Sequence, residues 1–274
     1  MLFSILIANY NNGHFFTDCY NSIIHQTYKN WEVIIVDDAS TDNSIDLING
    51  LIAGDSRFNL YQNDKNGGCG YTKRRCVELA TGEICGFLDP DDLLEPNALE
   101  VMVNLHLQNK QASLIYSNYF KADENLKNRK KCPSHALKSD FLTTLEGWVS
   151  HFATFKRSLY LKTQGIDAKF KRAVDQDLYY KMEEVGSLLY EEKYLYIYRI
   201  HDGGISVNDN ELAAFSWKLV AVIDACNRRN IDFEKIISSK LHNKFIYQNR
   251  NPLRVGNFIL APVRKLKKMF NLYL

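Results

Sequence analysis

The sequence predicts a mixed α/β fold in which a mostly parallel central sheet is flanked by helices. Short apolar runs at residues 2–8, 31–36 and 84–88 have the composition of buried strands, and segments with helical spacing of apolar residues lie between them. A turn-rich or acidic stretch follows each of these strands. Such regular alternation of strands and helices is typical of a doubly wound sheet.

The first part of the chain contains the clearest elements. Residues 2–8 form a nearly continuous apolar run that ends in the turn sequence NYNNG. Apolar side chains then recur at helical spacing, which predicts a helix over residues 16–26. The same patterns predict a strand at 31–36, a helix at 44–52, a strand at 58–62, a helix at 71–80 and a strand at 84–88.

The second part is predicted with less regular patterns. We expect a helix at 97–109, a strand at 113–118, a mobile polar and basic loop at 121–138, strand or loop at 148–154, and helices at 157–163 and 175–186. A tyrosine-rich strand follows at 188–200, and residues from 211 onward are predicted to be helical. We therefore expect one α/β domain over residues 1–206 and a helical C-terminal extension over 207–274.

The overall composition narrows the classes of function. The chain has 274 residues, 46% of them hydrophobic, which is enough for a substantial core and argues against disorder. A formal net charge of +2 is too small to predict nucleic-acid binding. The six cysteines show no Cys-x-x-Cys pair, and neither a signal peptide nor a membrane-spanning apolar run is apparent, so we expect reduced thiols in a cytoplasmic protein that at most binds a membrane surface.

Acidic residues gather at the ends of two predicted strands, which we expect to open on the same edge of the sheet. They are Asp37 and Asp38 after the second strand, and Asp89, Asp91 and Asp92 in the sequence FLDPDD. In open α/β sheets, ligands bind beyond the carboxyl ends of the strands, where such carboxylates bind a divalent cation and, through it, phosphate. The competing interpretation of FLDPDD is an acidic turn in which Asp92 or Asn97 caps the next helix.

A glycine-rich loop at residues 66–70 precedes the helix that carries Lys73, Arg74 and Arg75. Glycines at a helix entry allow close approach of the backbone to a phosphate group, and a nearby cation neutralises its charge. The spacing is neither a Walker loop nor a Rossmann fingerprint, so a tight turn with exposed basic residues is the competing interpretation.

The ordered set of motifs resembles glycosyltransferase family 2, the large inverting group with the GT-A fold. The resemblance covers residues 2–206 and rests on SILIANYN at 4–11, VDDASTD at 36–42, NGG at 66–68, and ELATGE at 78–83 followed by FLDPDD at 87–92. It implies that residues 1–118 bind the nucleotide sugar and that residues 119–206 supply the acceptor and catalytic half.

The resemblance also implies roles for individual residues of the donor site. Tyr10 matches the residue that stacks on the nucleobase, and Asp38 matches the residue that hydrogen-bonds the base. Ala8, two positions before Tyr10 in the same motif, is also expected to bind the nucleotide sugar. Ordinary packing at a strand end is the alternative for Tyr10. Lys73 stands where many members have an arginine beside the diphosphate, which keeps the charge but loses the bidentate fork.

The resemblance further implies roles in metal binding and catalysis for the D-x-D pair, Asp89 and Asp91, and for two later motifs. Asp91 is the expected metal ligand, and Asp89 is expected nearer the ribose or the metal shell. Asp175, in AVDQDL at 173–178, matches the family's general base, although Val174 replaces the more common glutamate and N-capping by Asp175 is a rival role. His201, in YRIHDGG at 198–204, matches a residue that joins the metal shell or contacts the diphosphate.

The resemblance implies an inverting enzyme that uses Mn²⁺ or Mg²⁺ and moves a sugar from a nucleoside-diphosphate sugar, with a UDP-sugar as the expected donor. The acceptor is expected to be a sugar or a lipid-linked sugar, in bacterial surface polysaccharide or glycolipid synthesis. Two alternatives remain open: an inactive nucleotide-sugar-binding module, and a sugar nucleotidyltransferase. The latter is disfavoured because its basic glycine-rich loop normally follows the first strand, where this chain has residues 9–13 without Lys or Arg.

The C-terminal residues 262–274 have a basic and apolar pattern. On a helix, Leu266, Met269, Phe270 and Tyr273 share one face, and lysines lie beside or opposite it. This pattern suits peripheral binding to an anionic membrane on its cytoplasmic side. The competing interpretation is that the apolar face packs on the body of the protein or on a second subunit in a homodimer.

Overall fold

The computed structural model describes residues 1–137, 149–201 and 211–234. Its chain forms two compact units, Met1–Val222 and Ile223–Leu274. Among the helices that the structure describes, none combines the length and apolar character that crossing a membrane requires. The predicted boundary near residue 206 and the predicted helix at 262–274 lie outside the described residues, and both remain predictions.

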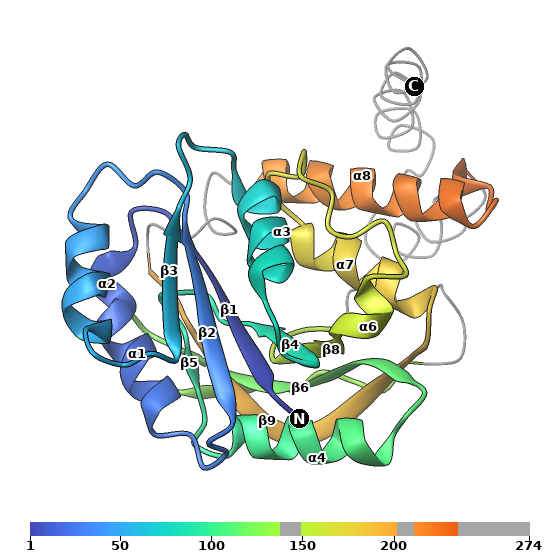
Figure 1. The fold of residues 1–274 in the computed structure, drawn as a ribbon. Helices are drawn as coiled ribbons and strands as arrows, with labels where there is room; N and C mark the ends of the chain where they lie inside the picture. The colour runs from blue at the N-terminus through green and yellow to red at the C-terminus, as the bar shows by residue number, and fades with distance from the viewer. Residues whose placement is uncertain (138–148, 202–210, 235–274) are drawn as a thin grey trace. The chain divides into compact units, whose positions relative to one another are not determined.

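Four parallel strands form one half of the sheet in the larger unit (Figure 1). Their order in space is β3 (Phe58–Gln62), β2 (Trp31–Asp37), β1 (Phe3–Asn9) and β4 (Ile84–Phe87). Asn9 lies opposite Asp37 in the register of β1 and β2. The polar residues after these strands therefore emerge at one edge of the sheet, as the sequence predicts.

Helices cover both faces of these strands. Helices α1 (Phe16–Ile24) and α2 (Ser44–Ile52) lie on one side and α3 (Cys69–Leu79) on the other (Figure 1). A short 3-10 helix, η1 (Gly13–Phe15), precedes α1. Predicted helix 44–52 and predicted strand 58–62 agree with the structure residue for residue.

The other half of the sheet is mixed. Beyond β4 the order is β8 (Ala153–Lys156), β6 (Ala112–Ala122), β9 (Ser187–Arg199) and β5 (Leu93–Leu94). Strand β8 is antiparallel to both of its neighbours, whereas β6 and β9 are parallel to each other. Helices α4 (Ala98–Gln108), α6 (Arg157–Tyr160) and α7 (Val174–Glu183) belong to this half, and α8 spans Glu211–Arg228.

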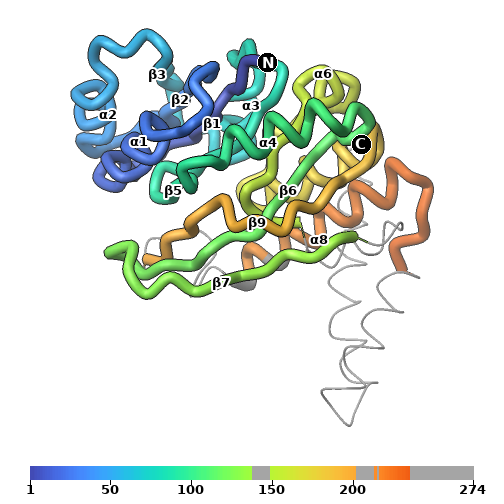
Figure 2. The backbone as a smooth tube through the Cα atoms, turned by 90° about the horizontal axis from the view of Figure 1, so that it is seen from below, coloured from blue at the N-terminus to red at the C-terminus, as the bar shows by residue number. Residues whose placement is uncertain are grey.

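The expectation of a loop over residues 121–138 is wrong at residues 121–122 and 130–132, which belong to strands. Strand β6 continues to Ala122, and β7 (Lys130–Cys132) pairs with it in an antiparallel hairpin. Figure 2 shows β6, β7 and β9 running side by side. The polar and basic composition that suggested a loop belongs to an edge strand, where exposed lysines are common because they discourage further strand pairing.

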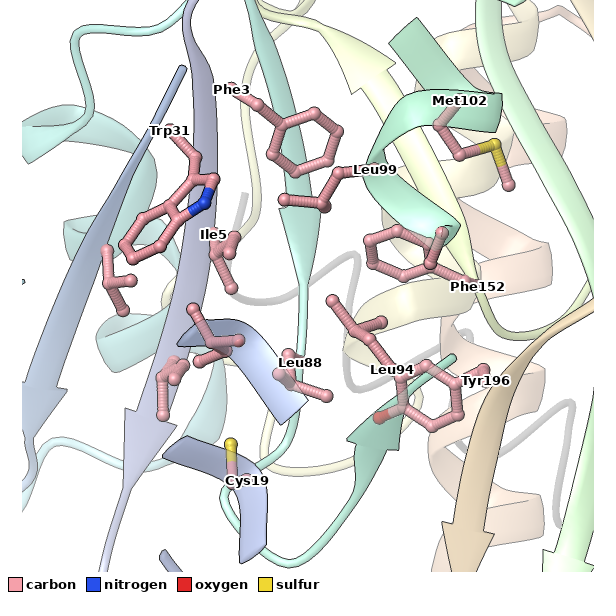
Figure 3. Close-up of a cluster of buried hydrophobic side chains, with 14 of the residues drawn as sticks. Phe3, Ile5, Cys19, Trp31, Leu88, Leu94, Leu99, Met102, Phe152 and Tyr196 are labelled. Carbon is pink, nitrogen blue, oxygen red and sulfur yellow. The ribbon is translucent and has the colours of Figure 1, made fainter. Parts of the chain in front are cut away.

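A large apolar core lies on one face of the sheet (Figure 3). Phe3, Ile5 and Ile7 point to this face of β1, as expected from the two-residue period of a strand, and Trp31 from β2 packs with them. Residues of α1, α2 and α4 complete the cluster, together with Phe152 and Tyr196 from the mixed half of the sheet. The core therefore joins the two halves and holds the carboxyl ends of the parallel strands in a common frame.

Candidate functional site

The first acidic strand end is a buried hydrogen-bonded turn. The carboxylate of Asp37 accepts bonds from Asn9 Nδ2 at 2.7 Å, from Ser40 N at 2.8 Å and from Ser40 Oγ at 2.6 Å. The backbone N–H of Asp38 donates to Asn9 O at 2.8 Å. These bonds join β1 to β2 at the point where both strands end, so Asp37 has a structural role here.

Asp38 holds the glycine-rich loop. Its Oδ1 accepts bonds from Asn63 Nδ2 at 2.6 Å and from Gly67 N at 2.9 Å, and its Oδ2 accepts one from Gly68 N at 2.8 Å. Gly68 has φ +85°, a backbone conformation that favours glycine. The loop is therefore fixed beside the strand end, and the expected contact of Asp38 with a nucleobase stays a prediction.

Tyr10 and Ala8 occupy the end of β1. Tyr10 is 47% exposed, which leaves much of its side chain accessible to a ligand. Ala8 lies opposite Val36 in the strand register and is partly buried. Tyr10 is thus not buried in the way expected of ordinary packing at a strand end. Its stacking on a nucleobase stays a prediction.

Lys73 is the residue that connects the two predicted catalytic segments. It lies on α3, is 5% exposed, and its Nζ is 3.0 Å from Asp175 Oδ1 and 3.3 Å from Asp89 Oδ1. The ammonium group also lies 5.0 Å from the centre of the Phe87 ring. An exposed basic residue after a tight turn is thus the wrong interpretation for Lys73, which forms a buried bridge between two carboxylates.

This bridge shifts the protonation of its members. Burial, the largest single influence, would raise the pKa of Asp175, but the charge of Lys73, the neighbouring His151 and the hydrogen bond from Lys73 together hold that pKa below its ordinary value. Burial likewise opposes the charged form of Lys73, while Asp175 and then Asp89 raise its pKa well above the usual range. Lys73 stays charged and Asp175 stays ionised at neutral pH.

Asp175 lies in the first turn of α7 and does not cap that helix. Ala173 is the residue before the helix, and the structure shows no side-chain capping bond there. N-capping by Asp175 is therefore the wrong interpretation, because its carboxylate faces Lys73 on another element. Gly70 permits this approach: its N–H donates to Phe170 O at 2.8 Å, and a Cβ on Gly70 would lie 2.5 Å from that oxygen.

A buried ion pair fixes α7 to the preceding loop. Lys181 Nζ lies 2.7 Å from Asp177 Oδ2 and donates to Gly165 O at 2.8 Å, and the two side chains are 2% and 0% exposed. Asp167 N donates to the same Asp177 oxygen at 3.2 Å. Asp177, which follows Asp175 by two positions, thus anchors the helix through contacts of its own.

The two predicted metal ligands are neighbours. His201 Nε2 lies 2.8 Å from Asp91 Oδ2, although the residues are far apart in the sequence, and the imidazole packs 4.6 Å from the centre of Phe15. Burial and then the negative charge of Asp89 raise the pKa of Asp91, so a bound cation would stabilise the ionised carboxylate. The carboxylate oxygen suits Mn²⁺ or Mg²⁺, and the imidazole nitrogen is a ligand that Mn²⁺ accepts more readily than the harder Mg²⁺.

Within the described ranges, no group of three or more His, Cys, Asp or Glu side chains is arranged to hold a metal ion. Asp91 and His201 would thus provide two ligands, which fits a cation that completes its shell with substrate oxygens and water.

Residues 88–92, between β4 and β5, form a loop that carries Asp89 and Asp91 and is called the acidic loop below. Asp92 and Arg199 hold this loop in place, a role that the motifs did not indicate. Asp92 accepts bonds from Tyr196 Oη at 2.7 Å and from Arg199 N at 2.8 Å, so its proposed capping role is wrong. Asn97, the other capping candidate, makes no side-chain capping bond. The Arg199 side chain donates to Asp91 O at 2.8 Å and to Asp18 Oδ2 at 2.7 Å.

A pocket opens where these elements meet. Three predicted site residues line it, namely Lys73, Asp89 and Asp175, together with His151 and Tyr179. Tyr10, Asp38 and the Asp91–His201 pair lie outside its lining. His151 follows no recognisable motif, and only its position before β8 could have indicated that it reaches the site.

Comparison with known proteins gives a consistent result. The model of the glycosyl transferase family 2 matches residues 4–164. Chondroitin synthase of Pasteurella multocida is 28% identical over 260 residues, which cover 94% of this chain and 24% of that protein. Hyaluronan synthase of Pasteurella multocida is 29% identical over 235 residues, which cover 85% of this chain and 24% of that protein. The chain thus spans about a quarter of the length of these relatives.

Solved structures share the fold. TarS 1–349 of S. aureus in complex with UDP-GlcNAc has a TM-score of 0.69 at 18% identity, covering 83% of this chain and 67% of that one. The mannosyltransferase PcManGT from Pyrobaculum calidifontis, in complex with GDP-Man and Mn²⁺, has a TM-score of 0.57 at 15% identity, covering 94% and 84%. Together with the sheet order, these likenesses confirm the predicted GT-A fold.

Proposed function

Because the chain belongs to glycosyltransferase family 2, we propose that it transfers a sugar from a nucleoside-diphosphate sugar to an acceptor hydroxyl, with inversion at the anomeric carbon. The observation that carries this proposal is the bridge from Lys73 Nζ to Asp175 Oδ1 and Asp89 Oδ1. It brings a candidate base, a cation and the first aspartate of the D-x-D pair to one pocket. A binding module without activity would not need a base at this place.

The proposed donor is a UDP-sugar. TarS was solved with UDP and with UDP-GlcNAc, and PcManGT with GDP-Man and Mn²⁺, which supports a nucleotide-sugar donor and a divalent cation for this chain. The cation would be held by Asp91 and His201, whose side chains are adjacent. When bound, it offsets the negative charge of the departing diphosphate.

The chain's own residues supply the remaining chemistry. Asp175, kept ionised by Lys73, accepts the proton of the acceptor hydroxyl as that oxygen attacks the anomeric carbon. Lys73 lies where its charge also attracts the diphosphate, and its position is fixed because the ammonium group is buried between two carboxylates. Tyr10 and Asp38 are proposed to bind the nucleobase, with Ala8 in the same strand end.

The acceptor is proposed to be a sugar or a lipid-linked sugar in bacterial surface polysaccharide or glycolipid synthesis, on the cytoplasmic side of the membrane. The names of the two Pasteurella multocida relatives support the polysaccharide setting. Acceptor pockets are formed by variable loops, so the relatives do not determine the acceptor of this chain.

The function is tested by thermal shift with a panel of nucleotide sugars, with and without Mn²⁺, followed by transfer and donor-hydrolysis assays. Asp175→Asn should reduce turnover by about a hundredfold or more, since proton removal by a general base contributes at least that much, while donor affinity stays near wild type. Asp46→Asn, on the exposed face of α2, is the matched control.

The outcomes separate the alternatives. Donor binding by the wild type without any turnover would support an inactive module, and release of pyrophosphate from a nucleoside triphosphate would support a nucleotidyltransferase. A parallel loss of donor affinity and turnover in Asp175→Asn would make Asp175 a donor ligand.

The tail at residues 262–274 is proposed to bind an anionic membrane surface, with packing on the protein body or in a homodimer as the alternative. Co-sedimentation with anionic liposomes compares the full chain with one that ends at Ala261. Weaker binding of the shortened chain supports the membrane role, and equal binding of the two chains excludes it.

A further inference from the structure

His151 is a polar residue of the pocket to which neither the motifs nor the proposed mechanism assign a role. It lines the same cavity as Lys73, Asp89 and Asp175, and it belongs to the segment that enters β8. Strand β8 lies between β4, which leads into the acidic loop, and β6. The topology therefore places this histidine next to the end of β4.

Stacking on two tyrosines fixes the orientation of the His151 imidazole ring. The His151 ring stacks on Tyr196 with centroids 4.8 Å apart and planes at 15°, and on Tyr198 at 5.7 Å and 11°. Tyr119 meets the ring edge-on at 5.9 Å and 86°. Such contacts fix the side chain before a ligand arrives, which lowers the entropic cost of binding.

The stack is tied to the acidic loop. Tyr196 Oη donates to Asp92 Oδ2 at 2.7 Å and accepts a bond from Asp89 N at 3.3 Å. The orientation of His151 is therefore set by the same strand, β9, that positions the loop carrying Asp89 and Asp91.

The ring nitrogens of His151 make no hydrogen bond with the residues that the structure describes. Two other histidines differ in this respect: His106 Nε2 lies 3.0 Å from Thr154 Oγ1, and His25 Nδ1 lies 2.7 Å from Asn21 O. A half-buried imidazole that lines a pocket, and whose nitrogens bond no residue in the described part of the chain, is available to hydrogen-bond a ligand.

Burial favours the neutral form of His151, against the pull of three nearby carboxylates. Burial lowers the pKa of His151, and the positive charge of Lys73 lowers it further. The carboxylates of Asp175, Asp89 and Asp91 raise it, but the net effect is a pKa below the ordinary value. A neutral imidazole has one donor and one acceptor nitrogen, which matches a hydroxyl group that both donates and accepts.

We propose that His151 binds a hydroxyl of a sugar substrate in the pocket beside Asp175 and thereby determines which sugar is accepted. This inference rests on the proposed function, and it leaves the source of the hydroxyl to experiment: the donor sugar or the acceptor sugar. A site built to bond a hydroxyl discriminates strongly against an analogue that lacks it, because the buried polar group is then left unpaired.

Packing of the aromatic stack is the competing role, and His151→Phe separates the two. Phenylalanine retains a planar ring that stacks on Tyr196 and Tyr198 but has no nitrogen. His151→Gln retains an amide that replaces one hydrogen-bonding nitrogen, so it should restore part of any loss caused by removing that bond. His25→Phe, at an exposed position after α1, is the control for loss of a histidine.

The experiment measures affinities for UDP, UDP-glucose and UDP-N-acetylglucosamine by calorimetry, and kcat and KM for transfer to a panel of monosaccharide glycosides. Affinity for UDP should be unchanged in every variant. A loss of about tenfold in affinity for the UDP-sugar in His151→Phe, with partial recovery in His151→Gln, identifies the donor sugar. A similar loss in kcat/KM for the glycoside alone identifies the acceptor.

Equal affinities and equal kcat/KM values for wild type and His151→Phe would overturn the inference, with circular dichroism confirming that the variant is folded. Equal losses in His151→Phe and His151→Gln, accompanied by a lower Tm in both, would assign a packing role and also overturn it. Failure of the wild type to bind any nucleotide sugar would instead overturn the proposed function, and the inference with it.

Discussion

Replacement of Lys73 by methionine tests the electrostatic core of the site. Methionine keeps most of the volume of the buried stem and removes the positive charge between Asp175 and Asp89. Without that charge, burial dominates the protonation of Asp175, so its pKa should rise. The expected result is an enzyme that needs a higher pH to hold its base in the ionised form.

The size of this shift follows from distance and exposure. At the 3.0 Å separation of Lys73 Nζ and Asp175 Oδ1, an effective dielectric of about 20 gives roughly 5 kcal/mol of attraction. The Asp175 side chain is 35% exposed, so water screens much of this attraction and exposed pairs contribute only about 0–1 kcal/mol. An intermediate value of about 1–2 kcal/mol corresponds to roughly one pKa unit.

The assay is the pH dependence of donor turnover at constant Mn²⁺, with released nucleoside diphosphate as the readout. The native pKa of Asp175 is lowered, so activity falls only as the pH drops through that low value. In Lys73→Met, the acid limb of the kcat profile should move to higher pH by about one unit. Reading kcat separates this effect from any loss of donor affinity.

Lys73→Arg is the matched control because it retains the charge, and its acid limb should stay near that of the wild type. An unchanged acid limb in Lys73→Met, or a move to lower pH, would refute the reasoning that Lys73 sets the protonation of Asp175. An equal shift in both variants would point to displaced geometry instead of lost charge.

Three further results are expected. Asp91→Asn should abolish the part of UDP affinity that depends on Mn²⁺, as measured by calorimetry with and without the metal, whereas retained metal dependence would exclude Asp91 as a ligand. Lys181→Ala should lower the free energy of unfolding by about 3 kcal/mol in urea, because it leaves Asp177 charged and buried; a change near zero would contradict the anchoring role. Tyr10→Ala should weaken UDP binding about tenfold without changing Tm, since loss of base stacking costs about 1–3 kcal/mol, and unchanged affinity would return Tyr10 to a role in packing.

The sequence by itself determined the parallel half of the fold and supplied the candidate residues of the site. Apolar runs with a two-residue or continuous pattern and helices with a 3.6-residue pattern are encoded within a few positions, so the elements at 44–52 and 58–62 were predicted without tertiary information. The acidic strand ends were predicted to meet because parallel strands present their carboxyl ends at one edge. Asp91 and His201 were matched to a common metal shell by motif, and the structure places them together.

Only the tertiary structure decided how distant segments share the pocket. Lys73 and Asp175 are 102 positions apart, and nothing in the local pattern of either segment states their distance. Their contact depends on the close packing of Gly70 against Phe170. The position of His151 likewise depends on the antiparallel insertion of β8 between β4 and β6. Local propensity reports periodicity within one element, whereas these contacts arise from sheet order and packing across the whole unit, which the sequence pattern does not express.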